Sequence, residues 1–235
     1  MATTQQSSTK QDILKHLMKQ GQATAHELAT ALDISQQAIR RHLKDLEAEE
    51  LISYQAVQVG MGRPQHIYQI SRQGRDRLRR ASGDGFPDSN SKFAVSLLDT
   101  LAETVGHEQL SSILRKQWER KAIEYRARLG TGSLQERVAN LVELRKAEGY
   151  MAEWYLVDSD SDDTGYRFIM TEHNCAISNV AESFPSVCSH ELEMFATLLP
   201  DCTIERTHWI INGEHRCGYS VQARKEHLAG QELLA

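Results

Sequence analysis

The sequence has no uninterrupted apolar run of the roughly 20 residues that a membrane-spanning helix needs, which argues against an integral membrane protein. Its first nine residues, Met1 to Thr9, are polar and lack the apolar core of a secretion signal, so we expect a cytoplasmic protein. Ser-His-Asp series, Gly-rich phosphate loops and H-E-x-x-H motifs are also missing, and we therefore do not expect an enzyme. Cysteine is absent from the first 174 residues, which concentrates any thiol chemistry near the C-terminus.

The charge of the chain is unevenly distributed. The net charge of −5 argues at first against a nucleic-acid partner. Residues 1–80, however, contain 12 Lys and Arg against 8 Asp and Glu, whereas residues 81–235 contain 15 against 24. Chance can produce such a difference, but a basic first third is also what a DNA-binding region would show.

Three short helices are predicted near the start of the chain, over residues 10–19, 24–32 and 35–50. The second begins with a capping box formed by Thr24 and Glu27, and Ser35 caps the third. Asp33 and Ile34 form the turn between them. Two helices joined by so short a turn are typical of a helix-turn-helix unit.

Two strands are expected to follow, over residues 51–59 and 66–70, and then a basic helix over residues 71–80. The strands are separated by the glycine-rich turn Gly60-Met61-Gly62-Arg63-Pro64, an arrangement that predicts a wing. Residues 10–80 are therefore expected to form a winged helix-turn-helix DNA-binding domain.

The polar face of the third helix is expected to read DNA. Gln and Arg can each make paired hydrogen bonds to base edges in the major groove, and a wing arginine can reach the minor groove or a phosphate. A solvated helix face and a protein-binding winged helix are the alternatives, and the basic charge of this region favours DNA. The expected DNA-binding residues are Gln36, Gln37, Arg40, Arg41, Lys44 and Arg63.

The fold class that these patterns predict is α+β. After a disordered tail over residues 1–9 and the winged helix-turn-helix domain, residues 81–90 are a linker rich in Gly, Pro and small polar residues. Residues 91–149 are expected to be a helical dimerisation segment, and residues 150–235 a small C-terminal α+β sensor module. Within that module we predict strands over residues 150–157, 166–170, 203–211 and 219–223, and helices over residues 176–183 and 189–199.

The acidic run over residues 158–163 is expected to be a solvated turn, because it lacks the Gly and the distal Glu of a calcium-binding EF-hand loop.

All four cysteines lie in the last 61 residues, at Cys175, Cys188, Cys202 and Cys217, with the spacing C-x12-C-x13-C-x14-C. Four thiolates suit tetrahedral zinc or an iron–sulfur cluster. Structural zinc usually takes closely spaced pairs of cysteines, which are missing here, whereas a cluster accepts ligands from separate elements. A thiol switch and small buried hydrophobic side chains are the other interpretations. The predicted positions at the ends of elements, away from apolar faces, argue against the last.

With these motifs the sequence resembles the SufR family of iron–sulfur-binding repressors of the suf cluster-assembly operon. The resemblance covers nearly the whole chain apart from its polar tails, and the cysteine spacing is its most specific part. It rests on Gly62-Arg63-Pro64 in the wing and on the cysteine series within Asn174-Cys175, Cys188-Ser189-His190-Glu191-Leu192 and Leu199-Pro200-Asp201-Cys202.

The resemblance implies a homodimer with one [4Fe–4S] cluster in each subunit and with the four cysteines as candidate ligands. It implies that the holo form binds operator DNA, which we expect to be an inverted repeat, and represses the suf genes until the cluster is lost or oxidised. A site with three cysteines and one other ligand is the alternative; the nearest candidates for that ligand are His173, His190, Glu191 and His215. The alternative function is a winged-helix regulator that responds to zinc, thiol oxidation or an organic ligand.

Overall fold

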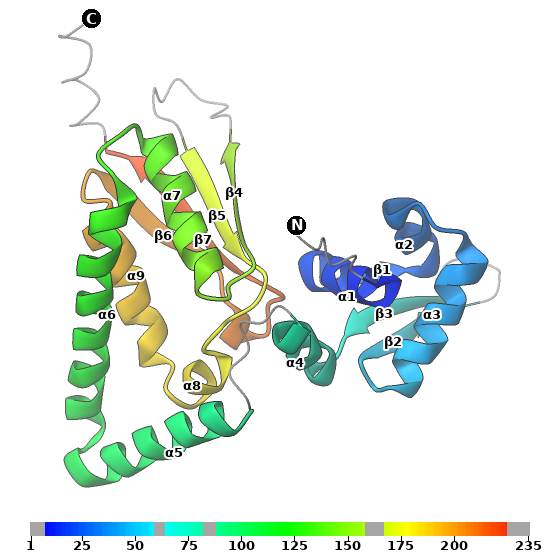
Figure 1. Ribbon diagram of the computed structural model, residues 1–235, viewed down its shortest axis with the longest axis horizontal. Helices are drawn as coiled ribbons and strands as arrows, with labels where there is room; N and C mark the ends of the chain where they lie inside the picture. Colours follow the sequence, from blue (N-terminus) through cyan, green and yellow to red (C-terminus); the bar gives the residue numbers. More distant parts are fainter. Residues whose placement is uncertain (1–7, 59–63, 82–87, 158–166, 225–235) are drawn as a thin grey trace, which may run out of the picture. The chain divides into compact units, whose positions relative to one another are not determined.

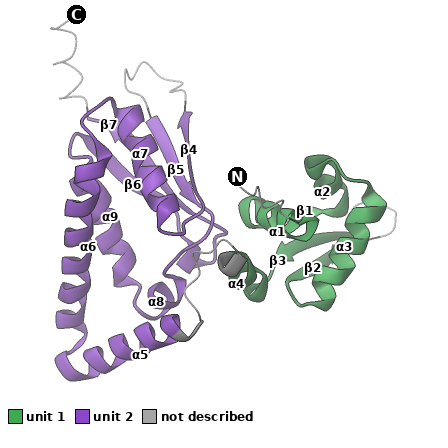
Figure 2. Cartoon of the chain, viewed as in Figure 1, with its two compact units in different colours: residues 1–85 green, residues 86–235 purple. Residues whose placement is uncertain are grey.

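The computed structural model describes residues 8–58, 64–81, 88–157 and 167–224 (Figure 1). The chain forms two compact units, residues 1–85 and 86–235, which are described separately (Figure 2). The wing turn with Arg63, most of the linker and the acidic run after residue 157 lie outside the described residues. Among the helices of the described parts, none is long and apolar enough to cross a membrane.

The first unit is a winged helix-turn-helix fold, as predicted. Its elements are α1 (Thr9–Gln20), β1 (Gln22–Thr24), α2 (Ala25–Leu32), α3 (Gln36–Ala48), β2 (Ile52–Val57), β3 (Gln65–Ile70) and α4 (Arg72–Ala81). The strands form an antiparallel sheet in the order β1-β3-β2. The helices bury one apolar face each around a core that includes Ile13, Leu17, Leu28, Ile39, Leu43 and Leu46.

Local signals set the helix boundaries in this unit. The predicted capping box is present: Thr24 Oγ1 accepts the backbone N–H of Glu27 at 3.2 Å, and Glu27 Oε2 accepts the backbone N–H of Thr24 at 2.7 Å. Asp33 ends α2 in the left-handed region, with φ 52°, and Ser35 caps α3. Gly74 lets α4 approach the segment between α3 and β2, because a Cβ at this position would lie 2.1 Å from the carbonyl oxygen of Leu51.

The second unit is a four-stranded antiparallel sheet with helices packed on it. Its elements are α5 (Asp88–Val105), α6 (His107–Leu129), α7 (Leu134–Ala147), β4 (Ala152–Val157), β5 (Arg167–Glu172), α8 (Ser178–Ser183), α9 (Ser186–Leu198), β6 (Cys202–His208), a 3-10 turn (Ile210–Asn212) and β7 (Cys217–Ala223). The strand order is β4-β5-β7-β6. Helix α7 packs on β4 and β5, α9 packs on β6, and α6 packs along α9 (Figure 1).

One hydrophobic core joins both halves of this unit. It takes Leu110, Trp118 and Tyr125 from α6, and it takes Phe168 and Tyr219 from the sheet. The helical segment over residues 91–149 and the following α+β residues, which were predicted as separate segments, therefore contribute to the same core. This packing means that α9, which carries Cys188, directly contacts α6.

Candidate functional site

The predicted DNA-reading face is the exposed side of α3. Ile39, Leu43 and Leu46 turn into the core, which leaves the opposite side of the helix in solvent. The five predicted DNA-binding residues of this helix are all exposed: Gln36, Gln37, Arg40, Arg41 and Lys44. The sixth, Arg63, lies outside the described residues.

A contact from the preceding helix orients the start of this face. The side-chain amide of Gln36 lies 2.6 Å from Nδ1 of His26 on α2. This bond connects the two helices of the motif at the end where base-reading residues are found in such domains. His26 was not predicted to contact this face, because only the fold brings it beside Gln36.

Three of the four cysteines lie at the ends of elements, and the fourth lies inside a helix. Cys175 is in the turn between β5 and α8, and Cys202 and Cys217 are the first residues of β6 and β7. Helix α9 begins at Ser186, three residues before the predicted residue 189, so Cys188 lies in its first turn and not just before it. The expectation that the cysteines avoid apolar surroundings is also wrong: Cys188, Cys202 and Cys217 are 7%, 1% and 8% exposed and belong to the hydrophobic core.

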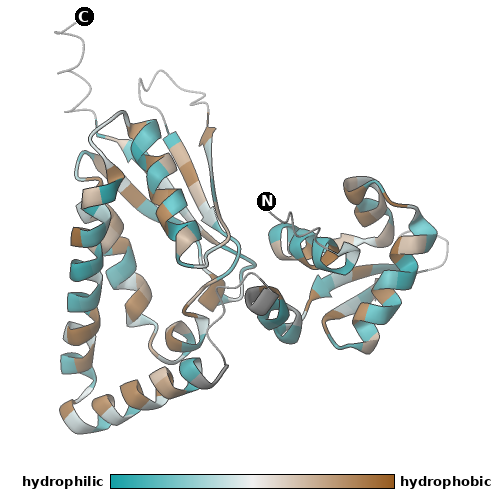
Figure 3. Cartoon of the chain, viewed as in Figure 1, coloured by the Kyte–Doolittle hydropathy of each residue, from teal (hydrophilic) through white to brown (hydrophobic). Residues whose placement is uncertain are grey.

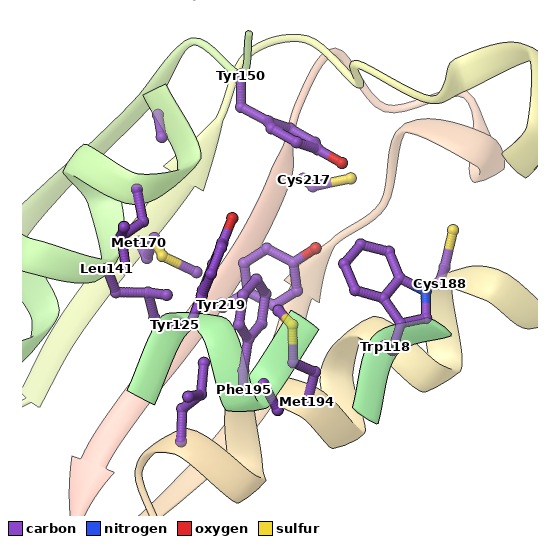
Figure 4. Packing of buried hydrophobic residues seen from close by; sticks show 14 of the residues in the cluster. Trp118, Tyr125, Leu141, Tyr150, Met170, Cys188, Met194, Phe195, Cys217 and Tyr219 are labelled. Carbon is purple, nitrogen blue, oxygen red and sulfur yellow. The ribbon is translucent and has the colours of Figure 1, made fainter. Parts of the chain in front are cut away.

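The structure brings together Cys175, Cys188 and Cys217. Burial is the main cause that raises the pKa of Cys175, and Glu191 and the thiol of Cys217 add to it. Burial likewise raises the pKa of Cys217 to about 12, with smaller contributions from Glu172, Glu191 and Cys188. Figure 4 shows Cys188 and Cys217 in one packed cluster of side chains. Three thiols from three separate elements thus share one buried environment.

Cys202 lies at the other end of the sheet. It pairs with Ala223, the last residue of β7, whereas Cys217 is the first residue of that strand. Six residue steps along β7 separate these two ends, a distance of about 20 Å. Burial raises the pKa of Cys202 to about 12 and Asp201 adds to it, so its charged neighbours differ from those of the other three thiols. In this structure Cys202 does not share a site with Cys217.

N–H groups face the three grouped thiols. The backbone N–H of Ile177 lies near Cys175 and that of Ile210 lies near Cys217, and each acts to lower the pKa of the neighbouring thiol. The indole N–H of Trp209 also acts to lower the pKa of Cys188. The Nε1 atom of Trp209 is buried, and among the described residues no partner lies within hydrogen-bond distance of it. Nε1 of Trp118 is likewise buried without such a partner, and Figure 4 shows it on the side of its ring toward Cys188. Such donors stabilise thiolates and cluster sulfurs, so the residues present fit an iron–sulfur cluster.

A buried charged network lies beside the three thiols and is centred on Arg145 of α7. Its guanidinium donates to Glu172 on β5 through Nε at 2.6 Å and Nη2 at 3.3 Å, and to Glu191 on α9. The hydroxyl of Tyr219 on β7 donates to Glu191 at 3.0 Å. Burial raises the pKa of Glu172 to about 7 against the opposing effect of Arg145. The guanidinium also lies 3.5 Å from the ring centre of Tyr150.

Sequence reasoning missed this network, although one signal pointed to it. Arg145 stands on the apolar stripe of its helix, four residues after Leu141 and seven after Val138, both of which are buried. A charged residue at such a position is rarely buried unless it is paired. The position therefore indicates a buried partner, but the sequence does not show that the partners are Glu172 and Glu191.

The proposed non-cysteine ligands already have other contacts. His173 Nε2 lies 3.3 Å from Glu153, and His190 contacts Ser111 at 3.0 Å. Glu191 belongs to the Arg145 network, and His215 also has an interaction partner. Within the described parts of the chain, no three His, Cys, Asp or Glu side chains lie close enough together to hold a single metal ion.

Comparison with known proteins supports the N-terminal assignment. A family of winged helix-turn-helix DNA-binding domains matches residues 6–53. Together with the observed fold, this match identifies the first unit as a winged helix-turn-helix DNA-binding domain. No curated protein matches the chain.

Solved structures give matches of low identity. A mutant of ZitR from Lactococcus lactis in apo form is 22% identical, covers 42% of this chain and 82% of its own, and has a TM-score of 0.28. PadR from Bacillus subtilis in complex with operator DNA is 12% identical, covers 59% and 91%, and has a TM-score of 0.30. The phenol-responsive sensory domain of the transcription activator PoxR is 13% identical, covers 62% and 81%, and has a TM-score of 0.40.

Proposed function

We propose that this protein is a transcription repressor whose DNA binding depends on a [4Fe–4S] cluster, and that Cys175, Cys188 and Cys217 hold the cluster. The observation that carries the proposal is the placement of these three cysteines in one hydrophobic core. Cys217 lies opposite Glu172, three residues before Cys175, and α9, which carries Cys188, is bonded to β7 through Glu191 and Tyr219. The resemblance to the SufR family supports the same reading and adds the suf operon as the target. Cys202, at the opposite end of β7, is left out of the ligand set.

Burial favours a cluster over a thiol switch at this site. Redox-sensing cysteines are typically accessible and have a lowered pKa. Here burial raises the pKa of each of the three thiols, and two of them are buried in the hydrophobic core. When bound, a cluster links the three elements that carry its cysteine ligands. This link is lost when oxidants damage the cluster or when iron is scarce.

The output of the switch is a pair of α3 helices held by a dimer. Helices α5 and α6 carry exposed apolar side chains, notably Phe93 and Leu97 on α5, and we assign the dimer contact to this region (Figure 3). A two-fold dimer would place two recognition helices about 34–36 Å apart on an inverted-repeat operator. The three cysteine-bearing elements share a core with α6, so ordering the site would favour one packing of that helix. A coupling of this kind typically changes DNA affinity about 5–150-fold.

The proposal is tested by anaerobic purification followed by reconstitution with ferrous iron and sulfide. We expect near-equal iron and sulfide, a visible cluster absorbance, and tighter binding of the suf promoter duplex by the holo form in a gel shift. Separate replacement of the three grouped cysteines by Ser should abolish the absorbance and weaken the shift, whereas Cys202→Ser should keep both. Equal DNA binding by holo and apo protein, or uptake of zinc alone, would disprove cluster control.

A further inference from the structure

Each of the three grouped cysteines has a polar neighbour in the buried Arg145 network. Glu172 is three residues before Cys175 and pairs with Cys217 across β5 and β7. Glu191 lies three residues after Cys188 on α9, close to one helical turn. Tyr219 is two residues after Cys217 on β7, so both side chains point to the same face of the sheet.

One side chain connects these three elements. Arg145 donates hydrogen bonds to Glu172 through two nitrogens, and one of these nitrogens also donates to Glu191. Glu191 in turn accepts a hydrogen bond from the hydroxyl of Tyr219. The guanidinium of Arg145 is fully buried, and the side chains of Glu172 and Glu191 are 2% and 8% exposed. A planar guanidinium can make this set of bonds, and the point charge of a Lys ammonium cannot reproduce them.

The turn that follows α7 is fixed in the same place. The amide of Asn174, next to Cys175, donates to the carbonyl of Gly149 at 2.8 Å, and its oxygen accepts the backbone N–H of Met151. The ring of Tyr150 between them stacks on the guanidinium of Arg145. The position of Cys175 therefore depends on α7 through two routes.

We propose that Arg145 is a positioning residue for the three-cysteine site. It holds the ends of β5, α9 and β7 in the arrangement that brings Cys175, Cys188 and Cys217 together, and it connects that arrangement to α7. This inference rests on the proposed cluster site and adds a residue that touches none of the thiols directly. Outer partners of this type commonly change metal affinity by 10–100-fold when they are replaced.

The chain contains a matched control on the same helix. Arg137 also forms a paired salt bridge from α7, to Asp201 at 2.8 and 2.5 Å, but this bridge lies beside Cys202. Arg137→Lys and Arg145→Lys therefore make the same chemical change at the two ends of one helix, and only the second is next to the grouped thiols.

The experiment compares these two variants with the wild-type protein after reconstitution with iron and sulfide. We expect Arg145→Lys to lose its visible absorbance to an iron chelator at least about 10-fold faster than wild type and to show an altered EPR signal on reduction. Arg137→Lys should match wild type in both. Equal cluster loss in all three proteins, or equal acceleration in both variants, would overturn the proposal. Thermal unfolding of the apo forms shows whether each variant is folded.

A second readout needs no cluster and includes a milder variant. In the apo proteins, mass spectrometry follows the alkylation of each cysteine by iodoacetamide. Arg145→Lys should speed alkylation of the three grouped cysteines and leave Cys202 unchanged, and Tyr219→Phe, which removes one hydroxyl, should act mainly at Cys217. An unchanged pattern would overturn the proposal. Failure of the wild-type protein to take up a cluster would instead count against the proposed function, and the alkylation pattern would still decide the role of Arg145.

Discussion

At the scale of single residues, burial separates two uses of arginine in this chain. Arg40 lies on the exposed side of α3, where a long cationic side chain is available to base edges and phosphates. Arg145 is fully buried, and its nitrogens bond to Glu172 and Glu191. The first is suited to recognition of a partner, and the second to fixing the protein's own elements.

Arg40 and Lys44 should differ in how they contribute to DNA binding. If Arg40 reads a base, Arg40→Ala should cost about 1–3 kcal/mol and relax sequence preference. If Lys44 contacts a phosphate, Lys44→Ala should weaken binding to all sequences and reduce the salt slope by about 1. Titration of operator and scrambled duplexes at several salt concentrations measures both effects.

The control for this pair is Lys15→Ala, which removes an exposed lysine from α1, away from the predicted reading face. It should leave the affinity and the salt slope close to the wild-type values. A loss for Lys15→Ala equal to that for Lys44→Ala would show that general charge, and not the face of α3, accounts for binding.

Residues on the reading face were predictable, and the Arg145 network was not. The face of α3 follows from helical periodicity within 13 residues, because Ile39, Leu43 and Leu46 define the buried side. The partners of Arg145 are 27 and 46 residues away in sequence, at Glu172 and Glu191. Such pairing depends on how the helix packs on the sheet, which local patterns do not contain.

At the scale of elements, boundaries with chemical signals were predicted well and those without were missed. Helix α6 lies within the predicted helical segment over residues 91–149, and glycines with positive φ, Gly106 and Gly130, flank it. Strand β1 was not predicted, because its three residues are too few for an alternating pattern and it forms by pairing with β3. The distance between Cys202 and Cys217 likewise follows from strand register, which cysteine spacing does not reveal.

The capping box at the start of α2 gives a pH-dependent prediction. Hydrogen bonds from the backbone and side chain of Thr24 hold the pKa of Glu27 below its usual value. The stability that Glu27 contributes is therefore present above the pKa it has in the unfolded chain, and is lost as the pH falls through its lower folded value. Thr24→Ala should cost about 1 kcal/mol at neutral pH.

This prediction is measured by thermal unfolding of the winged-helix unit in the full chain between neutral and acidic pH. Glu27→Gln should be less stable than wild type at neutral pH, and the difference should shrink as the pH falls. A difference that stays constant with pH would show that the charge of Glu27 does not take part in the cap.

At the scale of the whole molecule, helix α5 carries an exposed apolar surface. Phe93 and Leu97 are four residues apart on α5, so they lie on one side of the helix, and they are 70% and 48% exposed. Large apolar side chains grouped on a surface often mark an interface. The same helix precedes α6, which packs along the cysteine-bearing α9, so an interface here would join the second units of two chains.

If α5 forms the proposed dimer contact, the double variant Phe93→Asp with Leu97→Asp should make the protein monomeric, because two charges would be buried in the interface. Sedimentation velocity should show the monomer, and affinity for an inverted-repeat operator should fall by about 100-fold or more, since the gain from two linked binding sites is lost. Affinity for a single half-site should stay near the wild-type value, and the variant should still take up the cluster because its cysteines are untouched.

Tyr155→Ser serves as the control, since Tyr155 is 45% exposed on β4 and its replacement should leave the dimer intact. A double variant that stays dimeric would place the interface elsewhere, and a monomer with unchanged operator affinity would separate dimerisation from DNA recognition.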